Sequence, residues 1–208
     1  MKIASFRKIT DAAHLNIYEI AYADTRGRDR TWRIASRNDP PRAVSGAFAR
    51  PDAVVIVPYH TDTERLVIIR EFRVPLADYQ YGFPAGLVDG DESVTEAARR
   101  ELYEETGLTL TRVHRVSPPI YSSSGMTDES VCMVYADCTG TPSNKANTAS
   151  EDISALLVTP EDAARLCADQ TAKFDVKTWL VLSVFAETGR VFRRTATGSQ
   201  SVLSGDGG

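Results

Sequence analysis

The feature that most constrains this chain is the segment 86–108, in which acidic residues are concentrated between two glycines. Its composition predicts a helix, and on a helix Glu101 and Glu105 lie one turn apart while Glu104 lies three residues from Glu101. Carboxylates that share one stripe repel one another unless a cation lies between them. Such a density of hard oxygen ligands suits magnesium or manganese. The segment therefore predicts a divalent-metal site.

The rest of the segment contains the residues needed to hold that stripe in place. Either Asp91 or Ser93 caps the helix N-terminus, and Gly107 ends the helix in the left-handed conformation. A narrow apolar face is formed by Ala97, Ala98 and Leu102. Arg100 cannot lose its charge, so it is placed to hold a neighbouring carboxylate in one rotamer, with Glu92 as its counterpart near the helix start.

These residues also carry a resemblance to a known family. Residues 86–108 fit the pattern G-x5-E-x7-R-E-U-x-E-E-x-G-U, in which U is aliphatic, at every specified position, and the segment resembles the Nudix box. The alternative is a solvated acidic helix, but such a helix has no need of Gly86, Arg100 and Gly107 at fixed offsets. The resemblance implies an α+β fold, a Nudix-type α/β/α sandwich with a mixed sheet.

Composition is consistent with this resemblance. A chain of 208 residues with 42% hydrophobic content can bury one sizeable core, with room for a small extra subdomain. The net charge of -4 argues against a nucleic-acid-binding protein, which would show a basic stripe. No apolar run approaches the length of a membrane span, and the start of the chain lacks a secretion signal. We expect a cytoplasmic protein with no nucleic-acid or membrane partner.

Cysteine and histidine give no sign of a zinc or disulfide site. The cysteines, Cys132, Cys138 and Cys167, are odd in number, lack metal-ligand spacing and lie in apolar stretches. We expect reduced thiols in or near the core. The histidines are scattered along the sequence without a local pair.

The first part of the chain predicts a small β subdomain. Apolar and polar residues alternate over 17–22 and 31–36, with a polar turn at 24–29 between them, which predicts a β-hairpin. The Asn-Asp-Pro-Pro sequence at 38–41 breaks this pattern. Residues 1–45 are therefore expected to form an N-terminal β-hairpin subdomain.

The main domain, expected at 46–190, mixes strands with a few helices. Strands are predicted from apolar runs bounded by turn residues, at 53–59, 66–72, 110–116, 130–137 and 153–158. A helix is expected to start at 159–162, and a last helix is expected over 175–187, ended by Gly189. Residues 191–208 are expected to form a flexible tail. The mixture favours an α+β sandwich, the fold that the resemblance also implies.

The predicted chemistry is metal-dependent hydrolysis of a phosphoanhydride. Metal ions that bridge pyrophosphate oxygens neutralise charge, orient the substrate and acidify a bound water. Glu101, Glu104 and Glu105 are the expected ligands of Mg²⁺ or Mn²⁺, and the resemblance adds the backbone carbonyl of Ala85. Of the helix residues, Glu104, Glu105 and Arg100 are expected to take part in catalysis.

Outside the box, most of residues 30–187 resemble the ADP-ribose pyrophosphatase branch of the family. The sequence at 83–87 matches its Pro-Ala-Gly lead-in, and 70–73 resembles the strand end that presents a phosphate-binding arginine. Arg73 is therefore the first expected substrate contact, because a planar guanidinium can bind two phosphate oxygens at once. The alternative is an edge-strand arginine in a surface ion pair.

A general base is expected from a loop distant from the box. The sequence at 149–153 resembles an acidic loop of the branch, so Glu151 is a candidate both as a metal ligand and as the base. Relatives can carry a second glutamate two residues earlier, where this chain has Ala149. Asp128 and Glu129 are the alternative bases, and a plain solvated loop acid remains open for each of the three.

Further substrate contacts are expected from two other segments. Ser124 precedes Gly125 where the branch usually has a Ser-Pro-Gly turn, but the loop 121–125 is still expected to line the pocket. The resemblance implies that Trp32 and Arg33 contact a nucleobase across a dimer. The alternative for Trp32, which its type favours, is a place in the core.

The favoured hypothesis is a hydrolase of a nucleoside diphosphate linked to a sugar. ADP-ribose, which would give AMP and ribose 5-phosphate, is the first expected substrate of a homodimer, and another nucleotide sugar such as GDP-mannose is the second. A Nudix domain that binds nucleotide metabolites without catalysis is the alternative from another class, and the intact carboxylate set argues against it. A nucleic-acid decapping role is less favoured because the chain is acidic.

Overall fold

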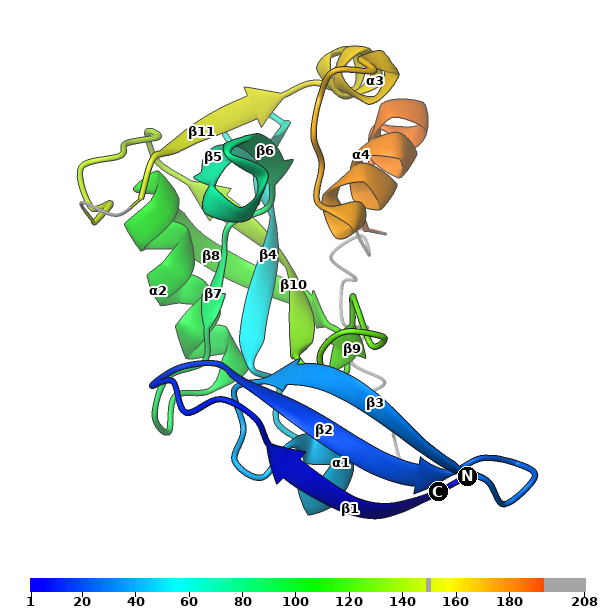
Figure 1. The fold of residues 1–208 in the computed structure, drawn as a ribbon. Helices are drawn as coiled ribbons and strands as arrows, with labels where there is room; N and C mark the ends of the chain where they lie inside the picture. Colours follow the sequence, from blue (N-terminus) through cyan, green and yellow to red (C-terminus); the bar gives the residue numbers. More distant parts are fainter. Residues whose placement is uncertain (149–150, 193–208) are drawn as a thin grey trace, which may run out of the picture.

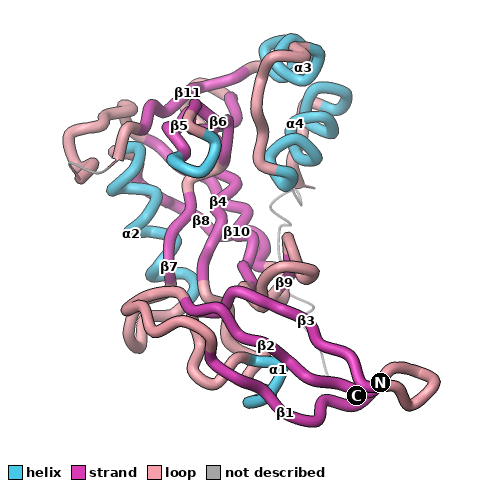
Figure 2. The backbone as a smooth tube through the Cα atoms, viewed as in Figure 1, coloured by secondary structure: helices cyan, strands magenta, loops and turns pink. Residues whose placement is uncertain are grey.

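The structure, a computed structural model, describes residues 1–148 and 151–192. A central mixed sheet carries helices on both faces, and a separate antiparallel sheet made by the N-terminal residues lies across one end of it (Figure 1; Figure 2). The predicted fold class, an α+β sandwich with a small N-terminal β subdomain, is confirmed.

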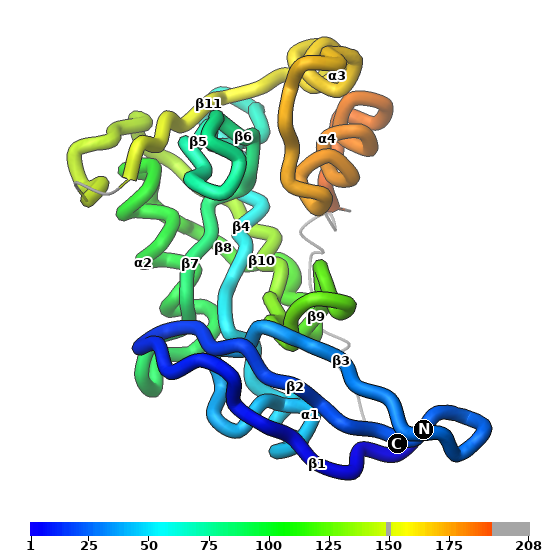
Figure 3. Tube along the Cα trace, in the orientation of Figure 1, coloured from blue at the N-terminus to red at the C-terminus, as the bar shows by residue number. Residues whose placement is uncertain are grey.

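Within the described residues, the N-terminal sheet contains one strand more than the predicted hairpin. β2 (Asn16–Ala23) and β3 (Asp29–Ser36) form the hairpin, and β1 (Lys2–Lys8) pairs antiparallel with β2. β1 is exposed over most of its length, so its sequence lacks the alternation of a half-buried strand. In Figure 3 this sheet is the blue segment at one end of the molecule.

In the described part of the chain, five long strands set the order of the main sheet. The order is β11 (Ile153–Val158), β5 (Arg65–Arg73), β4 (Ala53–His60), β10 (Ser130–Thr139) and β8 (Thr109–Val116). β10 runs parallel to β4, whereas the other neighbouring pairs are antiparallel. Each of the five lies where the sequence predicts a strand.

β4 and β5 pair with each other next to their connecting turn and then diverge. Their paired residues are Tyr59 with Leu66 and His60 with Arg65. Beyond this point two short strands take over as partners, β6 (Asp78–Gly82) beside β5 and β7 (Ala85–Leu87) beside β4. The segment that links β6 to β7 therefore fills the opening between the two long strands.

The short strands are the part of the sheet that the sequence does not predict. β6, β7 and β9 (Ile120–Tyr121), which pairs with β10, are too short to give an alternation that stands out from the surrounding loops.

Helices cover both faces of the main sheet. α2 (Val94–Thr106) lies on one face, and α3 (Pro160–Ala168) and α4 (Val176–Thr188) lie on the other, as Figure 1 shows. The short helix α1 (Arg42–Ser45) and the 3-10 turn η1 (Val74–Leu76) lie in connections. The predicted helices are confirmed, and Gly189 ends α4 with a φ of 65°.

Alternation along the strands builds two cores. Val54 and Ile56 of β4 belong to the cluster beneath α2, whereas Val55 and Val57 belong to the cluster beneath α3 and α4. The predicted apolar face of α2 is fully buried in the first cluster: Ala97, Ala98 and Leu102. Because β4 is buried on both faces, its sequence is a continuous apolar run.

Both ends of the acidic helix are fixed by local hydrogen bonds. Ser93, rather than Asp91, caps α2: its hydroxyl accepts from the amide of Glu96, while the Glu96 carboxylate accepts from the amide of Ser93. At the C-terminal end Gly107 has a φ of 70°, and a Cβ there would lie 2.9 Å from Cβ of Ser143. A larger residue at position 107 would therefore be both strained and crowded.

A buried arginine joins the N-terminal segment to the main sheet. Arg42 is 4% exposed, and its Nη2 lies 3.0 Å from Oδ1 of Asp52 on the approach to β4. Its other terminal nitrogen donates to Oγ of Ser130, and its backbone amide donates to Oδ2 of Asp128 at 2.7 Å. The same Asp128 oxygen accepts from the hydroxyl of Ser36 at 2.9 Å, so Asp128 belongs to this junction.

Two sequence-based expectations fall on residues that the structure does not describe. Residues 193–208 make up most of the predicted tail, and Ala149 in the predicted acidic loop is one of residues 149–150. The division of the chain at residues 45 and 190 stays a prediction.

The positions of the cysteines agree with the sequence analysis. Cys132, Cys138 and Cys167 are free, and the first two are buried, as expected for core thiols. Among the described helices, none combines the length and apolar character needed to cross a membrane.

We predict that Arg42→Met lowers the free energy of unfolding by about 3 kcal/mol, because it leaves the Asp52 carboxylate buried without its cation. Urea denaturation followed by circular dichroism measures this change. The matched control is Arg30→Met, which removes an exposed ion pair with Asp24 and should change stability by less than about 0.5 kcal/mol. Equal stabilities for the two variants would contradict the proposed role of the junction.

Candidate active site

The glycine that opens the acidic segment lies directly against one of its glutamates. A Cβ atom built on Gly86 would lie 1.9 Å from Oε1 and 2.0 Å from Cδ of Glu101. No side chain fits at such distances, so a larger residue at position 86 would displace the carboxylate. Because Gly86 belongs to β7, this contact fixes how α2 lies against that strand.

Arg100 links the loop before α2 to the helix itself. Its Nη1 lies 2.7 Å from Oε1 of Glu101 and 3.2 Å from Oε2 of Glu104. Its Nη2 donates to the Glu92 carboxylate and, at 2.9 Å, to the backbone carbonyl of Leu87. A planar guanidinium with five donors can satisfy all these acceptors at once. The geometry is the one expected of a residue that holds carboxylates in fixed rotamers.

Glu105 is the buried member of the stripe. It is 7% exposed, and its Oε2 accepts a hydrogen bond from the amide of Ala85 at 3.0 Å. Burial raises the pKa of Glu105 to about 9; the Ala85 amide opposes this shift and the charge of Glu101 adds to it. Burial also raises the pKa of Glu101. Without a cation, the Glu105 carboxyl therefore holds a proton at neutral pH.

Glu104 is the exposed member of the stripe, with 46% of its side chain accessible. It faces Arg100, whereas Glu101 and Glu105 face β7 through Gly86 and Ala85. Among the described residues, no three side chains of the metal-binding types converge closely enough to form a ready cation site. The ligand set predicted from the sequence therefore stays a prediction.

An open pocket of about 360 Å³ lies beside β7, where the acidic segment begins. Its apolar floor comes from β4 and β10, and its rim carries six charged side chains. These form three ion pairs: Arg73 with Glu71 at 2.8 Å, Arg37 with Glu129 at 3.2 Å, and Lys177 with Asp175 at 2.7 Å. Since each cation already has a carboxylate partner, an anionic ligand would compete with that carboxylate.

Some residues predicted from the sequence meet in this pocket. Arg73, Ala85 and Glu129 line it together with Gly86. Arg73 is half exposed and pairs with Glu71, its neighbour on the same face of β5. Arg73 thus lines the pocket and also forms an ion pair, and its role as a substrate contact stays a prediction.

Other predicted substrate contacts lie outside the lining. Ser124 and Gly125 do not line the pocket, although Ser122 of the same loop does. Trp32 is 51% exposed on β3 and its Nε1 donates to the carbonyl of Gly125 at 3.0 Å, so the expectation that Trp32 lies in the core is wrong. Arg33 also lies on β3, where it pairs with Glu19. This part of β3 is exposed because it is the outer strand of a sheet that stands apart from the main core.

The three candidate bases have different surroundings. The Glu151 carboxylate accepts from the amide of Thr148 at 2.8 Å, and its charge contributes to the raised pKa of Glu105. Glu129 lines the pocket beside Arg37. Asp128 is engaged in the junction with Arg42, which fits a structural acid better than a mobile base.

Sequence reasoning missed four charged residues of the pocket: Arg37, Glu71, Asp175 and Lys177. Glu71 had a usable signal, because it lies two residues before Arg73 on a predicted strand and therefore shares its face. Arg37 follows β3 and Lys177 lies in the first turn of α4. Their approach to the pocket depends on how the N-terminal sheet and α4 pack, which periodicity does not predict.

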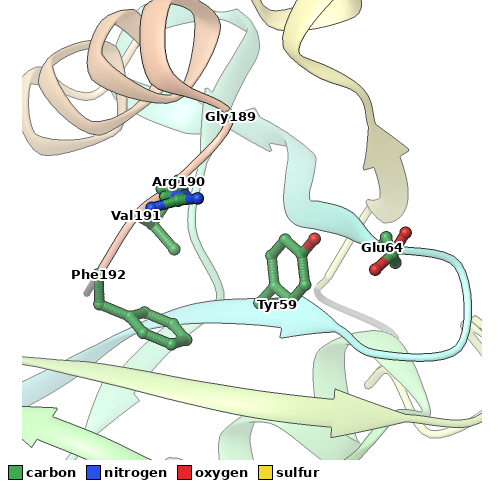
Figure 4. A pocket seen from close by; sticks show the side chains of 6 residues that line it. All are labelled: Tyr59, Glu64, Gly189, Arg190, Val191 and Phe192. Atoms are coloured by element: carbon green, nitrogen blue, oxygen red, sulfur yellow. The ribbon is translucent and has the colours of Figure 1, made fainter. Parts of the chain in front are cut away.

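A second pocket, of about 310 Å³, lies elsewhere in the molecule. Figure 4 shows Tyr59 of β4 between Glu64, on the turn to β5, and the segment 189–192 that follows α4. It contains no residue of the acidic segment and borders residues that the structure does not describe. We therefore place the candidate active site in the first pocket.

Comparison with known proteins agrees with this arrangement. A family profile described as NUDIX domain matches residues 49–180, which is more than half of the chain and includes α2 and the pocket strands. The chain belongs to the Nudix family. The resemblance found in the sequence is thereby confirmed, and with it the identification of residues 86–108 as a Nudix box.

Curated Nudix relatives resemble this chain over part of their length. "Putative nudix hydrolase 2" of Caenorhabditis elegans is 30% identical over 147 residues, covering 67% of this chain and 64% of that protein. "ADP-ribose pyrophosphatase" of Saccharomyces cerevisiae is 29% identical over 132 residues, covering 63% and 55%. The matches thus span less than two thirds of these relatives. They confirm that the chain resembles the ADP-ribose pyrophosphatase branch.

A crystal structure titled ADP compounds hydrolase shares the fold. It superposes with a TM-score of 0.67 at 21% identity, covering 89% of this chain and 92% of that one. The agreement extends beyond the residues matched by the Nudix profile, since the profile covers residues 49–180. At 21% identity, the similarity is evidence for a shared fold alone.

We predict that Glu105 makes the cation-free protein less stable as pH rises. The pKa of Glu105 is raised in the folded state. Its contribution to the free energy of unfolding is therefore fully present below the ordinary pKa near 4.5 and is lost as pH rises through about 9. In chelator, between about pH 6 and pH 8.5, the native protein should lose at least about 1 kcal/mol more stability than Glu105→Gln.

Thermal unfolding at a series of pH values measures the difference, which corresponds to roughly 2–4 °C in Tm for a chain of this size. Parallel pH profiles for the two proteins would show that Glu105 is ionised in the folded state without a cation.

Proposed function

We propose that this protein hydrolyses the pyrophosphate bond of a nucleoside diphosphate linked to a sugar, with ADP-ribose as the first substrate and AMP and ribose 5-phosphate as products. The observation that carries the proposal is the glutamate stripe of α2 beside a pocket that contains Arg37 and Arg73. Relatives named ADP-ribose pyrophosphatase in yeast and Bacillus subtilis support this substrate.

The stripe suits a divalent cation, and Nudix hydrolases generally use one. Glu105 is buried beside Glu101, and the one arginine at the stripe already contacts Glu92 and Glu104 as well. The carboxylates therefore carry more negative charge than Arg100 neutralises. We propose Glu101, Glu104, Glu105, Glu151 and the carbonyl of Ala85 as the groups that hold Mg²⁺ or Mn²⁺. A bound divalent cation neutralises charge on pyrophosphate oxygens and acidifies a bound water.

The protein's own residues bind and orient the substrate. Arg73 and Arg37 lie in the same pocket, and each guanidinium can bind two phosphate oxygens in place of its present carboxylate partner. Arg100 acts as a positioning residue, because its contacts hold the Glu101 and Glu104 carboxylates near Glu92, in the loop that precedes α2. To act as a ligand of the cation, Glu105 would give up its proton.

Proton removal from the attacking water is assigned to Glu151. It is a loop carboxylate whose described hydrogen bond is to a backbone amide and not to a cation, so it is free of the neutralising arginine that Glu129 has. Glu129, which lines the pocket itself, is the alternative.

We also propose a homodimer formed through the N-terminal sheet. Apolar side chains around this sheet are exposed: Ile3, Phe6, Ile9 and Trp32. Several exposed apolar side chains around one small sheet favour an interaction surface there. In a dimer, Trp32 and Arg33 would reach a nucleobase in the pocket of the partner, which explains why they lie outside the pocket of their own chain.

We predict turnover of ADP-ribose in the presence of Mg²⁺ or Mn²⁺, measured as AMP release across a panel of nucleoside diphosphate sugars, dinucleotides and nucleoside triphosphates. Glu104→Gln and Glu105→Gln should each lower kcat at least about tenfold, because each removes a charge from the stripe. Glu151→Gln should lower kcat more than Glu129→Gln does.

The outcomes separate the alternatives. Preferred turnover of another nucleotide sugar, such as GDP-mannose, would correct the substrate and keep the reaction. Tight binding of one nucleotide without turnover of any would sink the enzyme hypothesis and favour a metabolite-binding domain. If Glu151→Gln retains full activity, the base lies elsewhere.

A further inference from the structure

One cation of the pocket has no role in the mechanism above. Lys177 lies in the first turn of α4 and lines the pocket, yet only 15% of its side chain is exposed. A lysine of this kind has its methylene stem packed against neighbours and its ammonium group at the polar surface. Here the polar surface is the pocket.

The ammonium group has donors to spare. It donates to Oδ2 of Asp175 at 2.7 Å, its one hydrogen bond within the described residues, whereas an ammonium carries three donors. The other oxygen of Asp175 caps α4 by accepting from the amides of Lys177 and Thr178. The helix N-terminus is thus closed by Asp175, and the lysine side chain is the group left to meet a ligand.

Hydrogen bonds to β6 hold this part of α4 in place. The carbonyl of Tyr81 accepts from the amide of Asp175 at 3.0 Å, and the amide of Tyr81 donates to the carbonyl of Lys173 at 2.7 Å. The residues on either side of Tyr81, Gln80 and Gly82, line the pocket. The backbone that carries Lys177 is therefore bonded to a strand that forms the pocket wall.

We infer that Lys177 is a further substrate-binding residue, whose ammonium donates hydrogen bonds to a phosphate oxygen of the bound diphosphate. This inference rests on the proposed function and adds a third cation to the two arginines. It approaches the pocket from α4, on the face of the sheet opposite α2. The phosphate takes the place of Asp175 as the partner of the ammonium, so Lys177 contributes to binding in the ground state.

The test compares binding of inorganic pyrophosphate and of ADP-ribose in chelator, by isothermal titration calorimetry. Lys177→Met keeps the length of the side chain and removes its charge, and it should raise both dissociation constants about tenfold, as the loss of one charge-assisted hydrogen bond does. Lys177→Arg should stay within about threefold of the native protein. Lys173→Met is the matched control, because Lys173 pairs with Asp78 outside the pocket and its loss should leave both constants unchanged.

A second variant separates binding from a structural role. Asparagine caps a helix about as well as aspartate, so Asp175→Asn keeps α4 capped while it removes the carboxylate that competes for the ammonium. Pyrophosphate should then bind more tightly, by about threefold or more. A lysine that serves only to hold α4 predicts no tightening, and that result would overturn the inference.

Turnover measurements keep this inference distinct from the proposed function. With metal present, Lys177→Met should raise KM about tenfold and change kcat little. If the native protein binds both probes through Lys177 and hydrolyses nothing, the inference stands and the proposed function fails. If ADP-ribose is hydrolysed and Lys177→Met matches the native protein in binding and KM, the proposed function stands and the inference is wrong.

Discussion

The contacts of Arg100 are the interaction on which the rest of the site depends. The guanidinium holds Glu101, Glu104 and Glu92, which belong to both the helix and the loop before it, and it also binds the carbonyl of Leu87 in β7. Without this cation, carboxylates on one stripe would repel one another and turn towards solvent. Gly86 completes the arrangement, because the absence of a side chain there lets the Glu101 carboxylate lie against β7. One charge and one missing side chain therefore decide where the acidic groups lie.

The divergence of β4 and β5 opens the candidate active-site pocket. Once the two strands part beyond Leu66, β6 and β7 enter between them and bring Ala85 and Gly86 to the pocket edge. Lys177 lines the pocket from the α4 side, whereas the glutamates of α2 do not line it: Glu101 lies against Gly86, and Glu105 accepts from the amide of Ala85.

The sequence predicts the long helices and strands and the local chemistry of the Nudix box. It does not predict features that depend on packing between segments distant in the sequence. The long strands and helices carry clear periodicity, and the Nudix box fixes its own spacing, so α2 and its apolar face were predictable. β1 is too exposed, and β6 and β7 are too short, to show a clear apolar periodicity in the sequence. Trp32 shows that the burial of a single residue is harder to predict. An aromatic side chain on an alternating strand suggests burial, but the N-terminal sheet leaves that position exposed. Arg37 and Lys177 reach the pocket through tertiary packing, which no local pattern reveals.

We propose that Gly86 and Arg100 hold the glutamates of α2 in place for a divalent cation, and a cation titration tests this arrangement without substrate. Titration of the protein with Mn²⁺, followed by electron paramagnetic resonance of the free ion, gives the dissociation constant without any need for turnover. Gly86→Ala forces the Glu101 carboxylate away from β7 and should weaken Mn²⁺ binding at least about tenfold. Gly125→Ala, where a Cβ meets open space, should bind Mn²⁺ as the native protein does. Equal affinities for the native protein and a folded Gly86→Ala variant would contradict the account.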